Sequence, residues 1–437
     1  MNQDNRYTEF YAERDEMQSL ELSDGIVSQA SHTLQQGVGK REIEDESTRY
    51  SYTMDERMPD FFLEGHPHLC DARQSVHGGG VDTDFSFLLG GEDGKSSCLH
   101  MLEAVAYSLD PRVVKVKAVV LHSCKDVSIL TSESDEAVHD HRLRTALMLN
   151  VVLEQDGRHE MGFASEQLQM GAEFVTDERI RRIAERAVAQ ADHLFRAVTP
   201  KGGDLPVVMA AGASGILLHE AIGHAFEADF NRKNMSIFSD KMGQSVCRPN
   251  ISIVDDGTLS LSSGSFACDD EGIKSQCTYL VRDGRLESYL HDRISARHYG
   301  VKPTGNGRRQ SFRHVPVPRM TNTYMLAGDA TKDDIISSVK HGIYAESFTN
   351  GQVQIGAGDF TFFLKTGFLI EDGHLTQPIR DVNIIGNGPS ALADISMVGN
   401  DLEMALAAGF CGKAGQQIPV GQGIPTVLVD KLTVGGV

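Results

Sequence analysis

The sequence predicts an α+β fold in two domains. We expect an N-terminal domain of antiparallel strands with helices over residues 1–200, and a strand-rich C-terminal domain over residues 201–437. A chain of 437 residues has room for two to three domains. Apolar and polar residues alternate in short stretches punctuated by Gly and Asp, which is typical of antiparallel strands. The segment "TPKGGDLP" (199–206) separates halves of different composition and is the best linker candidate.

The first part of the chain predicts strands, a loop and one helix. Alternating stretches over residues 17–53 indicate antiparallel strands. Residues 64–96, rich in Gly and polar residues, indicate a loop. "SSCLHMLEAVAYSLD" predicts a helix that begins after Ser96 or Ser97 as the N-cap and ends at Pro111.

The rest of the N-terminal half predicts further strands and one long helix. Val and Lys alternate within residues 112–132, and residues 142–166 contain two strand-like runs on either side of "QDGR". Residues 176–198 give the clearest helical pattern, with Thr176 as the cap, acidic residues in the first turn and Pro200 just after the end. This order favours a sheet covered by helices.

The second half begins with a strand, a Gly turn and a helix in "PVVMAAGASGILLHEAIGHAFEADF" (206–230), with Ser214 as a plausible N-cap. Beyond it, turn dipeptides such as "DDG", "RDG" and "EDG" stand between apolar alternations. This pattern predicts many strands with a few inserted helices, and therefore an α+β second domain.

Composition limits the classes of function. The net charge is -20 and the pI is near 5.2, so the chain repels nucleic acid and anionic membranes. A local basic cleft is still possible, and Gly305–His314 is the densest basic stretch. The seven cysteines are scattered without a CxxC pair, which indicates reduced thiols. With no signal peptide or membrane-length apolar run, we expect a cytoplasmic protein.

The stretch "HEAIGH" points to a metal site. On a helical wheel His219, Glu220, Gly223, His224 and Glu227 share a polar side, opposite an apolar arc. The two histidines are five residues apart, about 140° around the axis and about 7.5 Å along it. Both imidazoles reach one metal only if they converge or if the helix is locally wider, as in a π-bulge. Gly223 tolerates such a distortion and leaves room for a metal or substrate.

A hydrolytic zinc site needs a third protein ligand. The residues themselves leave this open between Glu227, Asp229, another histidine and a cysteine. Cys411 stands between glycines, where a backbone can approach a site closely, and ranks only weakly ahead of the other cysteines. An exposed polar helix face with two unconnected histidines explains the spacing equally well.

Longer stretches carry a resemblance to a known family. These are "LLHEAIGHAFEADFNRK", "SIVDDGT", "DDEG", "PTGNGRRQSFRH", "PRMTNTYM", "SVKHGIYA", "DISMVGND" and "CGKAGQQIPVGQGIPTVLVDKLTVGG". In order and without large gaps across residues 207–437, they resemble the TldD branch of the TldD/PmbA metallopeptidases. "DGIVSQASHTLQQGVGKREI" is similar to the family's opening strands. Residues 65–110 are shorter than the corresponding part of typical members.

The resemblance implies a site and an activity. The family motif is HExxxH, so His219 and His224 are the implied zinc ligands, and the cysteine of the "CGK" motif, Cys411, is the implied third. The implied activity is hydrolysis of short or unfolded peptides, or of related small amides. The implied assembly is a dimer that encloses the active sites, either a homodimer or a heterodimer with a paralogue. The shorter 65–110 segment leaves the chamber, the partner and the substrate undetermined.

The expected mechanism is hydrolysis by a zinc-activated water, with Glu220 taking its proton and passing it to the leaving amine. Candidate donors to the developing oxyanion are Arg308, Arg309, His314 and Tyr324, although each is more simply explained by structural contacts.

Two other functions are compatible with these residues. Cys411 could act as a nucleophile with a histidine, which leaves the adjacent His–Glu pair unexplained. The chain could also be a non-catalytic subunit, but the intact ligand set and Glu220 argue against this.

Overall fold

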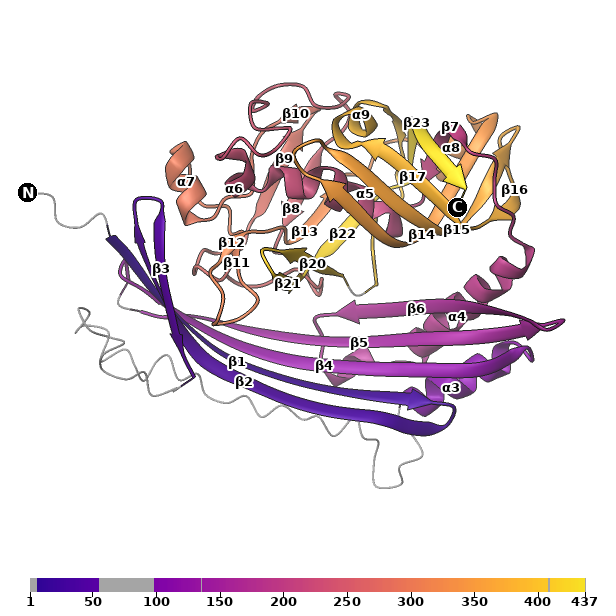
Figure 1. Cartoon of the computed structure of the whole chain (residues 1–437), viewed down its shortest axis with the longest axis horizontal. Coiled ribbons are helices and arrows are strands. Elements are labelled where there is room, and N and C mark those ends of the chain that lie inside the picture. The colour runs from indigo at the N-terminus through magenta and orange to yellow at the C-terminus, as the bar shows by residue number, and fades with distance from the viewer. Residues whose placement is uncertain (1–5, 55–97, 135, 408, 437) are drawn as a thin grey trace, which may run out of the picture.

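The computed structural model describes residues 6–54, 98–134, 136–407 and 409–436. The predicted loop at 64–96, the two candidate N-cap serines before Cys98 and most of the shortened 65–110 segment lie outside these ranges. The described residues confirm the α+β class (Figure 1).

The N-terminal half forms one antiparallel sheet of six long strands in the order β3-β2-β1-β4-β5-β6. The strands are β1 (Arg6–Ser23), β2 (Ile26–Glu44), β3 (Ser47–Thr53), β4 (Val113–Thr131), β5 (Val138–Gln155) and β6 (Arg158–Leu168). The helices are α3 (Cys98–Leu109) and α4 (Asp177–Arg196). Strands predicted from alternation at 112–132 and 142–166 are therefore confirmed.

Helices α3 and α4 cover one face of this sheet and form a hydrophobic core with it. Leu102 and Ile183 from the helices pack with Val120 and Leu149 from the strands, all fully buried. The predicted cap of α4 is confirmed, since the Thr176 hydroxyl accepts the Arg179 backbone N–H at 3.2 Å. The apolar side of each element therefore faces the other.

Strand β1 begins at Arg6, well before the region where sequence alternation indicated strands. Its early residues look polar, but Glu9 and Glu13 are buried because cations from elsewhere pair with them. Arg309 contacts Glu9, and Lys125 Nζ lies 3.1 Å from Glu13. Local alternation predicts that these charged side chains face solvent, but cations from distant parts of the sequence pair with them and allow them to be buried.

The C-terminal half contains two larger sheets. One follows the order β14-β7-β23-β17-β15-β16, with β18 on β23, and closes on itself because β14 also pairs with β15. Its strands are β7 (Gly203–Met209), β14 (His341–Gln354), β15 (Asp359–Glu371), β16 (His374–Ile379), β17 (Val382–Asn387), β18 (Ile395–Val398) and β23 (Val427–Gly436). The other follows the order β10-β9-β8-β13-β22-β19. Its strands are β8 (Ile253–Asp256), β9 (Cys277–Arg282), β10 (Arg285–Leu286), β13 (Asn322–Met325), β19 (Glu403–Met404) and β22 (Gly421–Ile424).

Short hairpins and helices complete the C-terminal half, as its glycine-rich turns predicted. The hairpin strands are β11 (Gly307–Arg308) with β12 (Val317–Pro318), and β20 (Phe410–Lys413) with β21 (Gln416–Pro419). The helices are α5 (Ile216–Leu218), α6 (Ala228–Asn231), α7 (Arg293–Tyr299), α8 (Lys332–Ser337) and α9 (Gly388–Ala393). Within the described ranges, no helix is long and apolar enough to cross a membrane.

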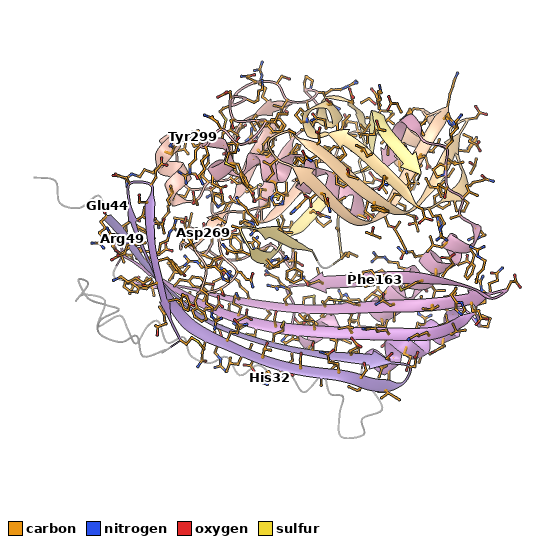
Figure 2. The ribbon with its side chains drawn as sticks, in the orientation of Figure 1. His32, Glu44, Arg49, Phe163, Asp269 and Tyr299 are labelled. Atoms are coloured by element: carbon orange, nitrogen blue, oxygen red, sulfur yellow. The ribbon has the colours of Figure 1, made fainter. Side chains whose placement is uncertain are left out.

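The long N-terminal sheet lies along one side of the C-terminal half (Figure 1). Ion pairs join the two across a buried contact, including Arg142 Nη1 with Asp270 at 2.8 Å and Arg41 with Glu271. Tyr11 and Phe312 meet in a small apolar cluster there. Figure 2 shows Asp269 near this contact and His32 on the outer side of the sheet. The domain boundary expected at residue 200 stays a prediction.

Candidate metal centre

The predicted strand, turn and helix are present at the start of the C-terminal half, with one correction. Strand β7 is followed by a 3₁₀ turn over Ala213–Gly215 and then by α5. Ser214 was expected to cap the helix, but it lies inside the 3₁₀ turn and makes no capping hydrogen bond. The Gly212 backbone, at φ 73°, makes the turn into the helix. A left-handed backbone is available to glycine without strain, so geometry replaces a side-chain cap here.

The helix widens at the two histidines. Residues His219–Gly223 form a π-helical turn, in which the His224 N–H donates to the His219 carbonyl oxygen. This i→i+5 pairing brings residues five apart onto neighbouring positions of one face, so the predicted bulge is confirmed. The apolar arc packs in the core, with Leu218 and Ile222 fully buried. Both histidines are also buried, at 5% and 7% exposure, so this is not an exposed polar face.

Cys411 reaches the histidines from a distant hairpin. It lies in β20, paired with Ile418 of β21, and its side chain is 2% exposed. Its Sγ is 3.2 Å from His219 Nε2 and 3.2 Å from His224 Nε2. The ligand atoms of these three residues all lie within 4.8 Å of one another, a geometry that can hold a metal ion.

The charges of this group suit metal binding. Burial by itself would raise the pKa of Cys411, but the His219 charge and hydrogen bonds from both imidazoles lower it to about 5. Burial would lower the pKa of His224, but the Glu227 charge and the cysteine raise it to about 10. Without a metal the group is therefore a thiolate beside an imidazolium, and an incoming cation replaces the proton between them.

Glu227 supports the second histidine and does not face the triangle of donors. Its Oε2 lies 3.1 Å from His224 Nδ1 and 3.0 Å from Lys413 Nζ. Burial would raise the pKa of Glu227, but Lys413 and then His224 lower it to about 2. Asp229, the other carboxylate considered as a ligand, lies 2.7 Å from the same lysine. Both carboxylates are thus engaged behind the donor atoms.

Sequence reasoning missed two cations beside the site, Lys413 and Arg319. Lys413 follows Cys411 by two residues in β20, so the "CGK" motif contains the signal that could have found it. Arg319 is fully buried, donates to the Cys411 carbonyl oxygen and lies 3.7 Å from Glu227 Oε1. The two cations stabilise the buried Glu227 charge and fix the strand that presents the thiolate.

Glu220 directly follows the first histidine and is partly exposed. Burial raises the pKa of its carboxyl, and the charges of His219 and His224 oppose that shift. Among the described residues, nothing donates a hydrogen bond to its carboxylate. This side chain therefore remains available to a bound water or substrate, which distinguishes it from Glu227.

One expectation about a neighbouring residue needs correction. Gly223 was expected to leave room for a metal or substrate. A Cβ on it would lie 2.2 Å from Met320 Sδ, so the thioether fills that space. The candidate oxyanion donors make structural contacts, as the simpler explanation expected: Arg308 with the carbonyls of Met320 and Pro419, Arg309 with Glu9 and Asp270, His314 with Ser311, and Tyr324 with Asp256. Their structural contacts account for them.

Two histidines and a cysteine that converge beside an available glutamate are an arrangement suited to a metal-dependent hydrolase. The comparisons with known proteins give the same class. Residues 202–436 match the PmbA/TldA metallopeptidase C-terminal domain, and residues 91–195 match the PmbA/TldA metallopeptidase central domain. The chain belongs to the TldD/PmbA metallopeptidase family.

Individual relatives cover nearly the whole chain. The metalloprotease TldD homolog of Haemophilus influenzae is 38% identical over 98% of this chain and 93% of its own length. The zinc metalloprotease TldD homolog of Saccharolobus solfataricus is 31% identical over 79% of this chain and 76% of its own. The crystal structure of TldE from Thermococcus kodakarensis has the same fold, with a TM-score of 0.74, 17% identity, and coverage of 98% of this chain and 97% of that one.

Proposed function

We propose that this metallopeptidase is a zinc enzyme in which His219, His224 and Cys411 hold the ion and Glu220 is the general base. The observation that carries the proposal is the convergence of the three donor atoms within 4.8 Å, across 192 residues of sequence. Imidazole and thiolate together favour zinc over magnesium or calcium, which prefer oxygen ligands. The name of the archaeal relative, a zinc metalloprotease, supports the same metal.

The chain's own residues divide the chemical work. When bound, zinc supplies a Lewis acid that lowers the pKa of a coordinated water towards neutrality. Glu220 accepts the proton of the attacking water and delivers it to the leaving amine, a role suited to a carboxyl whose pKa burial raises. Glu227 accepts the His224 Nδ1–H, which fixes the ring and leaves Nε2, 3.2 Å from Cys411 Sγ, as the nitrogen that would bind the ion. Burial of the three donors keeps bulk water away from them.

We further propose that the substrates are short or unfolded peptides, or related small amides, and that the enzyme acts in the cytoplasm as a homodimer or as a heterodimer with a TldD/PmbA paralogue. The likeness to TldE supports a partner of the same fold. Every cysteine in the described part of the chain is free, which suits a reducing compartment. The net charge of -20 disfavours direct nucleic-acid binding, and no membrane association is expected.

A cysteine nucleophile is the second candidate, because the pKa of Cys411 is lowered to about 5 by histidines after burial has raised it. Its sulfur, however, lies 3.2 Å from Nε2 of both imidazoles and is almost wholly buried, so a substrate carbonyl has little access to it. The third candidate is a non-catalytic subunit. It does not explain why a glutamate carboxylate, Glu220, stands unpaired beside the three donor residues.

The test combines metal content and turnover in one preparation. We expect about one zinc per chain, loss of peptide cleavage with a chelator, and recovery on adding zinc. Glu220→Gln should keep the zinc and lose about 10²–10⁴-fold in turnover of a peptide library. The control is Glu287→Gln, which changes an exposed carboxylate paired with Arg282. Active protein without metal, or a zinc-loaded Glu220→Gln variant with normal turnover, would refute the proposal.

A further inference from the structure

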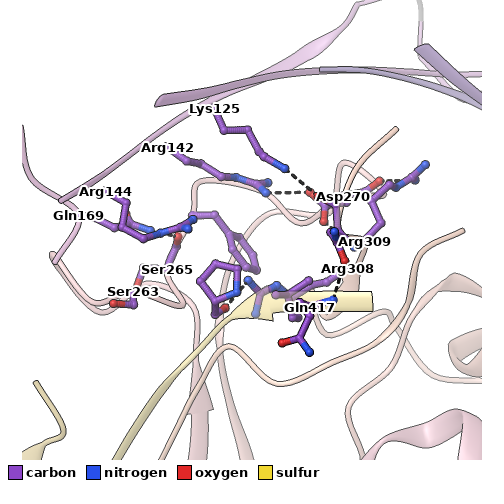
Figure 3. Close-up of a pocket in the computed structure, with 14 residues that line it drawn as sticks. Lys125, Arg142, Arg144, Gln169, Ser263, Ser265, Asp270, Arg308, Arg309 and Gln417 are labelled. Atoms are coloured by element: carbon purple, nitrogen blue, oxygen red, sulfur yellow. Dashed lines mark hydrogen bonds and ion pairs between the residues drawn. The ribbon is translucent and has the colours of Figure 1, made fainter. Parts of the chain in front are cut away.

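A second site lies where the N-terminal sheet meets the C-terminal half, apart from the metal donors. It is a pocket with about 380 Å³ of empty space, part of it continuous with solvent. Figure 3 shows cationic side chains from both halves pointing into it. The charged residues that line it are Lys125, Arg142, Arg144, Arg308, Arg309 and Asp270. Five cations therefore surround one carboxylate, in a chain whose net charge is -20.

Three of these cations are neutralised by carboxylates of the chain. The pairs are Lys125 with Glu13 at 3.1 Å, Arg142 with Asp270 at 2.8 Å, and Arg309 with Glu9. The carboxylate that lines the pocket is already used in one of these pairs. Lys125 also pairs with Asp15 at 3.3 Å and Arg142 with Asp140 at 2.7 Å, whereas Arg144 and Arg308 have no described carboxylate within ion-pair distance.

Arg308 is 4% exposed and donates only to carbonyl oxygens, those of Met320 and Pro419, while its Nε has no partner. Arg144 makes no ion pair or hydrogen bond with any residue that the structure describes, and its Nε is likewise buried without a partner. Burial lowers the pKa of Arg144 to about 10 and that of Arg308 to about 9. Carboxylates act on the two cations only from beyond ion-pair distance, Asp15 on Arg144 and Asp270 on Arg308.

A guanidinium removed from water without a direct ion-pair partner is unfavourable, and this pocket holds two, the buried Arg308 and the half-buried Arg144. Guanidinium groups are planar forks that match the oxygens of a carboxylate or phosphate. Arg308 belongs to Gly305–His314, the basic stretch that stood out in the sequence as a possible local cleft. The space open to the centre of a water-sized sphere is only about 30 Å³, so the pocket suits one compact group.

We propose that this pocket binds a compact oxyanion, a carboxylate or phosphate group, between Arg144 and Arg308. The anion comes either from a free oxyanion or from the carboxylate of a bound peptide. The second source rests on the proposed peptidase function. It is sterically reasonable because the pocket is also lined by Ile418 of β21, the cross-strand partner of Cys411.

The first experiment measures inorganic phosphate binding to the purified full chain by isothermal titration calorimetry at constant ionic strength. Arg144→Gln should weaken binding at least about tenfold, because it removes a charge-assisted hydrogen bond. Arg144→Lys should keep part of the affinity. The matched control is Arg14→Gln, a partly exposed arginine on the same sheet. Cross-strand pairing puts Arg14 with Asp126 and Arg144 with Ser123, so the two arginines lie on opposite faces.

A thermal melt of the same proteins separates anion binding from a structural role. Without phosphate, Arg144→Gln should unfold at the same or a higher temperature than the wild type, since it removes a half-buried charge that has no ion-pair partner. Phosphate should then stabilise the wild type and Arg14→Gln but not Arg144→Gln. Equal phosphate affinity in all variants, or no phosphate binding by the wild type together with a lower melting temperature for Arg144→Gln, would overturn the proposal.

The second experiment identifies the source of the anion. Tetra-alanine, as the free acid and as the C-terminal amide, is titrated into zinc-loaded Glu220→Gln protein with and without phosphate. Competition by the acid alone supports a substrate carboxylate, whereas phosphate binding without competition by either peptide supports a free oxyanion. The phosphate experiment needs no turnover, so its outcome is independent of whether the proposed peptidase function is correct.

Discussion

Replacing Glu227 with glutamine tests how the protein orients its second histidine. The Glu227 carboxylate is fully buried, with Oε2 3.1 Å from His224 Nδ1 and 3.0 Å from Lys413 Nζ. Glu227→Gln keeps the shape and removes the charge. We expect weaker zinc binding, because the imidazole loses the acceptor that fixes its tautomer and makes Nε2 more basic.

The expected loss of zinc affinity is about 10- to 100-fold, or about 1.4–2.7 kcal/mol. The smaller value applies if the glutamine carbonyl still accepts from Nδ1, and the larger value if its amide group faces the ring. The free energy of unfolding should fall by about 1–3 kcal/mol. Lys413 keeps Asp229 at 2.7 Å, and Arg319 keeps the Cys411 carbonyl, so neither cation is left wholly unpaired.

The assay is competition for zinc against a chromophoric chelator, with urea denaturation of each protein to confirm folding. Asp229→Asn is the matched control, because Asp229 contacts the same lysine but not the histidine. It should stay within about threefold of the wild-type zinc affinity, since the Nδ1 contact is intact. Wild-type affinity in folded Glu227→Gln would refute the orienting role. Equal losses in both variants would show that the lysine, and not the imidazole contact, controls the site.

The other predictions concern neighbouring atoms. Cys411→Ser should lose its zinc when the concentration of free metal is low. The control Cys268→Ser, which changes an equally buried thiol away from the donors, should keep its zinc. Full zinc occupancy in both variants would exclude the thiolate as a ligand. Gly223→Ala should lower the free energy of unfolding, measured by urea denaturation, by about 1–3 kcal/mol, because the new Cβ would meet Met320 Sδ at 2.2 Å. In a protein that also carries Met320→Ala, the same substitution should lower it by less. Zinc affinity should rise with pH and release about one proton per ion near neutrality. Burial would lower the pKa of His224, but its carboxylate partner raises that pKa to about 10, so the imidazolium is the group that must lose a proton. The Cys411 thiol, with a pKa of about 5, is already ionised. Calorimetry of zinc binding in buffers of different ionisation enthalpy measures the number of protons released.

Sequence patterns alone account for several local elements and for part of the site. Alternation in residues 112–132 and 142–166 predicted β4, β5 and β6, because the two faces of a strand meet different surroundings. The five-residue spacing of His219 and His224 indicated a π-helical turn as one of two ways to bring both rings to one metal, and the structure has that turn. The C-terminal motifs gave the family.

Which distant groups meet depends on the folded arrangement of the whole chain. From the residues alone, Cys411 ranked weakly among seven cysteines, and its place 3.2 Å from both imidazoles depends on a hairpin 187 and 192 residues away. The role of Glu227 as a support for His224 likewise depends on where Lys413 is brought. The periodicity of apolar residues indicates which side of a helix or strand is buried. It does not indicate which distant residue a given side chain will contact.

The same limit explains the remaining differences. Ser214 had the composition of a cap, but the backbone turned at Gly212 instead. The space beside Gly223 belongs to Met320, which arrives from a separate strand connection. The basic pocket forms only when Arg144 of the N-terminal sheet lies against Arg308 of the C-terminal half. Charge and packing between segments far apart in the chain are properties of the folded molecule, because each segment acquires its surroundings only when the others are in place.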